Sequence, residues 1–412
     1  MEEITKNTAK NTILLYFLTF AKLVFPLLTL PYLTRVLTSE SYGVVSYVKS
    51  CMAYMQIIVD FGFMLSAVKD IVKANGNEKE IGLIVGHVIG ARLILAFCIL
   101  ALTIVLCFCI PILRAYKLYT ILYVVSIMIT AFSADYLFRG IEKMHIITIV
   151  FVAAKGLVTA LTFILVKNDG DLLLIPIMEI IGNLASVIVT WLFIKKLKIR
   201  VYFKNIKETW IKLKDSGIYF ISTFSSTAFT ALNTVLIGIV VTDLTQVAFW
   251  SVAWQLVSAV LNLYAPIIDG VYPQMLQKKD LKFLLKILTL FMPIILLGCA
   301  FCFICAKWIL LIFGGATYAG AVPVFRLLLP LLIFSFPSML FGWPSLGVVG
   351  KEKQVTLSTF CAAIFQVVGL ILLVVIGGFT IYTVAILRCI TEAVIMLIRL
   401  IFLLKNKEEF KR

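Results

Sequence analysis

The sequence predicts an all-α integral membrane protein with about twelve transmembrane helices in two six-helix lobes around a central cavity. Two observations carry this prediction. The chain of 412 residues is 62% hydrophobic and 14% charged, whereas soluble proteins carry about 45–50% apolar and about 25% charged residues. The apolar residues also gather in runs of roughly 20 or more, the length that a helix needs to cross hydrocarbon. Water would not solvate such a surface, whereas a lipid bilayer would.

The predicted spans follow one another along the chain and are separated by short polar loops. The seventh span is the least apolar because it is rich in serine and threonine, which is typical of a helix that faces a water-filled interior. The predicted limits are 11–36, 42–71, 82–110, 118–138, 146–166, 172–194, 217–241, 246–268, 281–306, 322–349, 355–377 and 380–404.

Lysine and arginine predict the orientation of these spans. With the N-terminus inside, 25 of the 37 basic residues lie in the cytoplasmic segments and five lie on the opposite side. This asymmetry predicts that both termini are cytoplasmic. The formal net charge of +16 therefore reflects topology and contact with anionic membrane lipids, and no compact basic domain is present to bind nucleic acid.

The longest and most basic loop, 195–215, divides the predicted spans into six and six. We therefore predict an N-terminal lobe over 1–200, a basic cytoplasmic linker over 201–216 and a C-terminal lobe over 217–412. The linker is also weakly amphipathic, as expected of a segment that lies on the anionic inner leaflet.

Short matches between the two halves indicate that the lobes are repeats. Gly140-Ile-Glu-Lys ends the fourth span and Gly350-Lys-Glu-Lys ends the tenth, at an offset of 210 residues. A second match relates Ile57-Ile-Val-Asp to Ile267-Ile-Asp-Gly at nearly the same offset. Because both halves start inside, the repeat is expected to be parallel.

Four cations lie deep within predicted spans of the first half, and no carboxylate is adjacent to them in sequence: Lys22, Lys49, Arg92 and Lys155. Charges within a membrane are costly and usually face a cavity or a partner. A cationic cavity predicts an anionic ligand such as a phosphate or diphosphate. The alternative is that these cations pair with carboxylates of other helices.

Two further pairs have the i,i+4 spacing of structural ion pairs on a helix. They are Asp135 with Arg139 and Arg388 with Glu392. Polar stripes also run along the sixth and eighth spans, where they would hydrogen-bond sugars or act as polar contacts between helices. The candidates for facing sugars or a coupling ion are Asp60, Glu179, Asn183, Gln255, Asn262, Asp269 and Arg388.

Catalysis has little support in the sequence. The chain contains no GxSxG, HExxH or P-loop motif and only two histidines. The string Cys299, Cys302, Cys305 has no neighbouring His, Asp or Glu to complete a metal site, so it is interpreted as helix packing. We therefore predict neither enzymatic activity, nor a cofactor, nor a metal site.

Three stretches carry a resemblance to a known family. Pro31-Tyr-Leu-Thr-Arg-Val-Leu-Thr-Ser-Glu-Ser-Tyr-Gly43, Val59-Asp-Phe-Gly-Phe63 and Tyr136-Leu-Phe-Arg-Gly-Ile-Glu-Lys143 resemble polysaccharide flippases of the Wzx type. These flippases share the MOP superfamily with the multidrug and toxin extrusion (MATE) transporters and the lipid II flippases. The resemblance covers the whole chain, and Arg139 stands where the family often has glutamine.

The resemblance implies a MATE-like transporter in the bacterial cytoplasmic (inner) membrane. Its substrate would be an undecaprenyl-diphosphate-linked oligosaccharide, moved from the inner to the outer leaflet by alternating access for O-antigen or capsule biosynthesis. Lys22, Lys49, Arg92 and Lys155 would line the cationic cavity, and H⁺ or Na⁺ would act on Asp60 or Asp269 if transport is coupled. A polysaccharide polymerase and the chain-length machinery are the expected protein partners, and the chain itself is expected to be a monomer.

Three other interpretations stay open. A cation-coupled multidrug exporter has the same fold, but its cavity should be acidic or aromatic. A lipid II flippase is chemically closer, but those relatives usually carry two additional spans. A membrane polymerase would need a large external loop with charged catalytic groups, and all external loops here are short.

Overall fold

The computed structural model describes residues 2–227 and 231–410, and within these ranges the chain forms helices and no β-strand. The chain divides into two compact units, Met1–Thr227 and Ala228–Arg412. The all-helical prediction is confirmed. The boundary lies later than the sequence predicts, because the predicted linker and the first part of the seventh span belong to the first unit.

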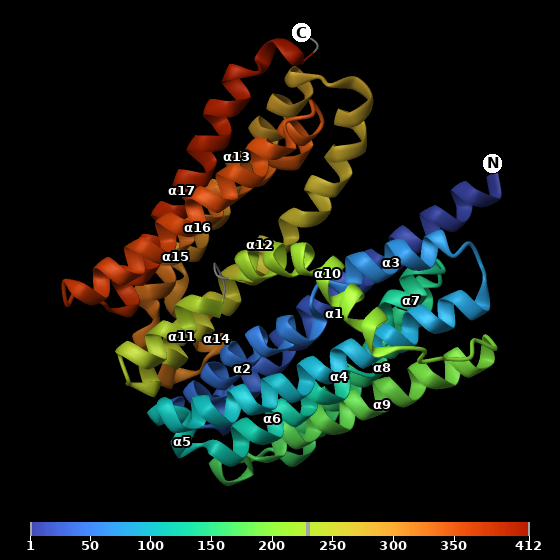
Figure 1. Cartoon of the computed structure of the whole chain (residues 1–412). Helices are drawn as coiled ribbons and strands as arrows, with labels where there is room; N and C mark the ends of the chain where they lie inside the picture. Colours follow the sequence, from blue (N-terminus) through green and yellow to red (C-terminus); the bar gives the residue numbers. More distant parts are fainter. Residues whose placement is uncertain (1, 228–230, 411–412) are drawn as a thin grey trace. The chain divides into compact units, whose positions relative to one another are not determined.

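The first unit is a helical bundle in which α9 packs on both α6 and α8, α1 packs on α8, and α4 packs on α6. Figure 1 shows α4, α6 and α9 running side by side in this unit. Its helices are α1 Glu2–Val36, α2 Ser39–Asp60, α3 Phe63–Lys73, α4 Glu78–Cys109, α5 Pro111–Ala115, α6 Lys117–Thr130, α7 Asp135–Gly140, α8 Met144–Leu165, η1 Asp169–Asp171, α9 Leu174–Lys196 and α10 Ile206–Thr227.

The second unit is built around α15, which packs against α12, α13 and α17, while α16 packs on α17. Its helices are α11 Ala231–Val240, α12 Leu244–Lys278, α13 Leu281–Ile304, α14 Ala306–Phe313, η2 Ala316–Ala321, α15 Val322–Phe341, the π-helical turn η3 Gly342–Gly347, α16 Glu352–Val375, α17 Ile381–Lys405 and η4 Lys407–Glu409.

Among the described residues, ten helical segments are long and apolar enough to cross a membrane. They correspond to ten of the predicted spans. The other two predicted spans are 217–241 and 380–404. The first is covered by the end of α10 and by the short apolar helix α11, with residues 228–230 outside the described ranges. The second is α17, a helix of 25 residues.

Two of the predicted spans are interrupted, and the interruptions position polar groups. The second span breaks after Asp60, where Phe61 and Gly62 have φ values of 40° and 75°. A side chain at position 62 would lie 2.6 Å from Cβ of Tyr219 in α10, so glycine is needed for both its conformation and this close approach. The fourth span breaks between α6 and α7, next to Ser133 and Asp135.

The segment between α9 and α10 lies along a glycine face of α4. The backbone N–H of Tyr202 donates to the carbonyl of Gly82 at 3.2 Å. A Cβ at Gly82 or Gly86 would lie 1.9 Å from the carbonyl oxygen of Arg200 or Tyr202, respectively. Glycines spaced four residues apart on one helix face therefore let the extended chain approach the helix axis closely.

Side-chain contacts continue this attachment along α10. His87 of α4 is buried, with Nδ1 3.2 Å from Thr209 Oγ1 and Nε2 2.9 Å from a carboxylate oxygen of Glu208. Further along, Lys212 is ion-paired with Asp70, and the hydroxyls of Ser66 and Ser216 are 2.6 Å apart. These contacts explain why the predicted linker is part of the first unit.

Replacing Gly86 by alanine is expected to loosen the segment from α4, because the new methyl group would overlap the Tyr202 carbonyl oxygen. We expect the free energy of unfolding to fall by about 1–3 kcal/mol and trypsin to cleave faster after Lys198 or Arg200, both of which are exposed. Gly217→Ala is the matched control, since a methyl group added there would have no neighbouring atom within 4 Å. Equal protease sensitivity of Gly86→Ala and wild type would contradict the role given to this face.

Candidate functional site

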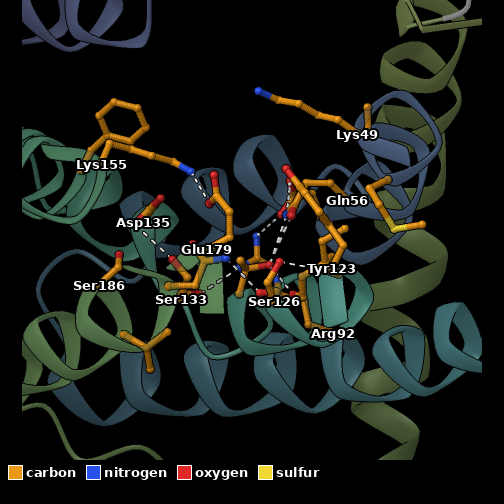
Figure 2. A pocket seen from close by; sticks show the side chains of 18 of the residues that line it. Lys49, Gln56, Arg92, Tyr123, Ser126, Ser133, Asp135, Lys155, Glu179 and Ser186 are labelled. Carbon is orange, nitrogen blue, oxygen red and sulfur yellow. Dashed lines mark hydrogen bonds and ion pairs between the residues drawn. The ribbon is translucent and has the colours of Figure 1, made fainter. Parts of the chain in front are cut away.

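A cavity of about 520 Å³ lies within the first unit, and all four cations predicted from the sequence line it: Lys22, Lys49, Arg92 and Lys155. They come from four different helices, α1, α2, α4 and α8. Figure 2 shows Lys49 extending into the same space as the side chains of Lys155 and Glu179. The bundle thus brings together charges that lie far apart in sequence.

Two of these cations have carboxylate partners on other helices. The Arg92 guanidinium donates to Asp60 Oδ1 at 3.1 Å and to the carbonyl of Ser133 at 2.8 Å, and it lies over the ring of Tyr136. Lys155 Nζ is 2.6 Å from Glu179 Oε2. The alternative of pairing between helices therefore holds for Arg92 and Lys155.

The other two cations, Lys22 and Lys49, are exposed to the cavity. Within the described ranges, neither ammonium group forms a hydrogen bond or an ion pair, although Lys22 Nζ lies 5.5 Å from the ring centroid of Phe151. A lysine ammonium group on its flexible stem can move to meet a ligand. These two side chains are therefore the cations most available to an incoming anion.

Charge is distributed unevenly within the cavity. Its lining includes the four cations and three carboxylates, those of Asp60, Asp135 and Glu179, which leaves a formal excess of one positive charge. An adjoining cavity of about 310 Å³ is lined by Lys22, Lys49 and Lys155, and Glu179 is the one carboxylate among the described residues around it. We call this region the lysine end of the site.

Away from the lysine end, the lining is rich in amides and hydroxyls. Gln56 donates to Asp60 Oδ2 at 3.1 Å and to Thr130 Oγ1 at 3.2 Å, and Asn183 donates to the carbonyl of Ser126 at 2.9 Å. Ser186 of α9 completes this part, which we call the polar end. Such groups hydrogen-bond hydroxyl-rich ligands without adding charge.

Several lining residues are absent from the sequence-based candidates. Ser126 and Thr130 are four residues apart on α6, and this i,i+4 polar spacing is the signal that reveals them. Asp135 is a different case. It lines the cavity and accepts a hydrogen bond from Ser133 Oγ at 3.2 Å, and no ion pair joins it to Arg139 in the described structure. The predicted Asp135–Arg139 pair is therefore wrong.

The remaining predicted residues belong to the second unit. Gln255 is half-buried, whereas Asn262 and Asp269 are exposed, all three on α12. Arg388 is ion-paired with Glu392 at 2.9 Å, with side chains 7% and 10% exposed, and its guanidinium lies over the ring of Trp254. The predicted Arg388–Glu392 pair is confirmed, and its burial indicates a structural role for Arg388.

Polar contacts within the second unit were not visible from the sequence pattern. Gln366 of α16 donates to Asn233 Oδ1 at 3.0 Å and accepts from the hydroxyl of Thr391. Arg399 donates to the carbonyl of Ser338 at 2.7 Å and to the hydroxyl of Ser358 at 3.1 Å. These bonds join α11, α15, α16 and α17, and act as polar contacts between apolar helices.

Comparison with known proteins places these features in context. Residues 8–279 match the family model described as "Polysaccharide biosynthesis protein". A relative from Shigella dysenteriae, named "Putative O-antigen transporter", is 30% identical over 269 residues, covering 65% of this chain and 67% of the relative. A relative of the same name from Escherichia coli K12 is 24% identical over 415 residues, covering 97% of each chain.

Solved structures of transporters share the fold. An inward-facing multidrug resistance MATE family transporter of the MOP superfamily superposes with a TM-score of 0.69 at 16% identity, covering 95% of each chain. A MOP superfamily transporter from Pyrococcus furiosus superposes with a TM-score of 0.56 at 16% identity, covering 99% of this chain and 97% of the other. The predicted MATE-like fold is confirmed.

Proposed function

The chain belongs to the polysaccharide biosynthesis protein family and has the MOP transporter fold, and from this premise we propose that it flips undecaprenyl-diphosphate-linked oligosaccharides. The lipid-linked repeat unit would move from the inner to the outer leaflet of the bacterial cytoplasmic membrane, with both termini of the protein in the cytoplasm. The two units would alternate in exposing the site to the two sides. The product would supply O-antigen or capsule assembly.

The observation that carries this proposal is the division of the first-unit cavity into a lysine end and a polar end. Lys22, Lys49 and Lys155 at the lysine end suit a diphosphate, because ammonium groups form short charge-assisted hydrogen bonds with phosphate oxygens. Gln56 and Asn183 at the polar end suit sugar hydroxyls. The substrate carries both chemistries next to each other.

The physical need for such a cavity follows from the substrate. Unpaired charge and unsatisfied hydroxyl groups are very costly in hydrocarbon, so a diphosphate with several sugars does not cross a bilayer unaided. A hydrophilic cavity replaces the lost hydration with protein groups. The polyprenyl chain needs no such replacement and would remain in the lipid.

A multidrug exporter of the same fold is the second candidate, since solved relatives in fold include multidrug transporters. The cavity does contain carboxylates. However, Asp60 and Glu179 are already engaged by Arg92 and Lys155, and the lining keeps a formal positive excess. An organic cation would therefore meet unpaired lysines, and the charge of the site favours an anion.

The test is transport by the purified full-length protein in proteoliposomes. We expect it to move a fluorescent undecaprenyl-diphosphate oligosaccharide between leaflets, measured by the fraction that dithionite added outside can quench. Undecaprenyl monophosphate without sugars is expected to move at least about tenfold more slowly, because it lacks the second phosphate and the sugars that the lysine end and the polar end would bind. A tenfold difference corresponds to about 1.4 kcal/mol of lost interaction. Export of ethidium without movement of the lipid-linked sugar would favour the multidrug exporter and overturn the proposal.

A further inference from the structure

The lysine end contains a carboxylate where a site built only to bind an anion would have none. Glu179 of α9 lines both adjoining cavities, next to Lys22, Lys49 and Lys155. Its Oε2 atom lies 2.6 Å from Lys155 Nζ, whereas Lys49 reaches into the same space without an ion-pair partner in the described structure. Glu179 thus forms an ion pair with Lys155, one of the three lysines that the proposed function assigns to the diphosphate.

This ion pair is accessible to a ligand. The side chains of Lys155 and Glu179 are 34% and 18% exposed, in contrast to the closed Arg388–Glu392 pair. A lysine ammonium group carries three donors on a flexible stem, so it can leave one acceptor for another without rearrangement of the helix. A diphosphate in the lysine end would bring several negatively charged oxygens close to Glu179, and like charges at short distance repel each other.

We propose that Glu179 is an intramolecular competitor of the diphosphate, a residue that holds Lys155 while the cavity is empty and yields it to the ligand. This inference rests on the proposed function and adds to it a reason for the carboxylate. In the empty state, Glu179 reduces repulsion among the three lysines. During release, it recaptures Lys155 and so weakens the hold on the departing anion.

Competition also affects anions of different charge to different extents. To bind Lys155, a ligand must interact with its ammonium group more favourably than Glu179 does, whereas Lys22 and Lys49 are available to any anion. A monophosphate carries fewer charged oxygens than a diphosphate and competes less well for Lys155. The diphosphate displaces Glu179 and so meets the full cost of the competition, whereas an anion that leaves the Lys155–Glu179 pair intact does not. Removing the competitor should therefore raise the affinity for the diphosphate at least as much as that for the monophosphate, and discrimination between them should not become smaller.

The test is binding of geranyl diphosphate and geranyl monophosphate to the purified full-length protein in detergent, measured by calorimetry. Glu179→Gln keeps the shape of the side chain and is expected to bind geranyl diphosphate about tenfold more tightly, which corresponds to about 1.4 kcal/mol. The gain for geranyl monophosphate should be no larger. Glu80→Gln removes the same charge from an exposed position outside the cavity and should leave both affinities unchanged.

A double-mutant cycle separates competition from a general charge effect. If Glu179 occupies Lys155, Lys155→Gln should cost more affinity in the Glu179→Gln background than in the wild type, because only there is Lys155 wholly available. Glu179→Asp, whose carboxylate is one methylene shorter, should give an intermediate affinity and serves if Glu179→Gln does not fold.

The outcomes distinguish the inference from the function on which it rests. Wild-type binding that depends on Lys22 and Lys49, together with unchanged or weaker binding by Glu179→Gln, overturns the competitor role and leaves the proposed function standing. Absence of binding of geranyl diphosphate and of lipid-linked sugar transport by the folded wild type overturns both. Equal gains for Glu80→Gln and Glu179→Gln would show a long-range charge effect and overturn the inference.

Discussion

Replacing Lys22 and Lys49 together by alanine is expected to lower transport of the lipid-linked oligosaccharide by at least about a hundredfold. A hydrogen bond to a charged group contributes about 1.5–3 kcal/mol, so each lysine lost should reduce transport by about tenfold or more. Both side chains are exposed to the cavity and lack an ion-pair partner in the described part of the chain, so their removal leaves no buried charge behind. The measurement is the initial rate in proteoliposomes.

Two controls make this result specific. Lys73→Ala removes an exposed cation at the end of α3, outside the cavity, and should transport at the wild-type rate. The unfolding transition of the double variant should match that of the wild type, because neither lysine supports the fold. Wild-type transport by the folded double variant would show that the diphosphate is held elsewhere.

The largest expected effect on stability comes from Arg388 in the second unit. Arg388→Met should lower the free energy of unfolding by about 3–5 kcal/mol, since it leaves the carboxylate of Glu392 buried without its partner. Restoring balance with Arg388→Met/Glu392→Leu should recover most of the loss, because replacing both members of a buried ion pair by apolar residues is often neutral. Unfolding in mixed micelles with increasing dodecyl sulfate gives the free energies.

Lys405→Met is the matched control for this pair, since Lys405 is exposed at the end of α17 and the substitution has the same chemistry. Its unfolding free energy should remain within about 0.5 kcal/mol of the wild type. If Arg388→Met were equally harmless, the guanidinium would not be the group that stabilises Glu392.

The predicted spans rest on a strong signal, because a helix that crosses hydrocarbon must be long and continuously apolar. For the same reason, charged residues stand out in the sequence when they lie within these apolar spans. Their partners could not be read from the chain, however. Helical periodicity reports neighbours three and four residues apart, whereas Arg92 and Asp60 are 32 residues apart and Lys155 and Glu179 are 24 apart.

The boundary between the units shows a second limit of hydropathy. A basic loop between apolar runs has the composition of a linker, and nothing in that composition indicates that it packs against a helix. The signal lies elsewhere in the sequence, in the glycines at 82 and 86 of α4, which leave room for the backbone of residues 200–202. The spacing of glycines on α4 thus determines that residues 200–202 pack on the first unit.

The attachment of this segment to α4 has a practical consequence for distance spectroscopy. A spin label or fluorophore at Lys204, which is exposed and lies between the glycine contacts and the His87–Glu208 contact, would move with the first unit. It would serve as a fixed reference from which displacement of a second label on α16 could be timed during turnover. The background must first lose two exposed thiols, Cys98 and Cys109, whereas the exposed Cys361 on α16 can be kept to carry the second label.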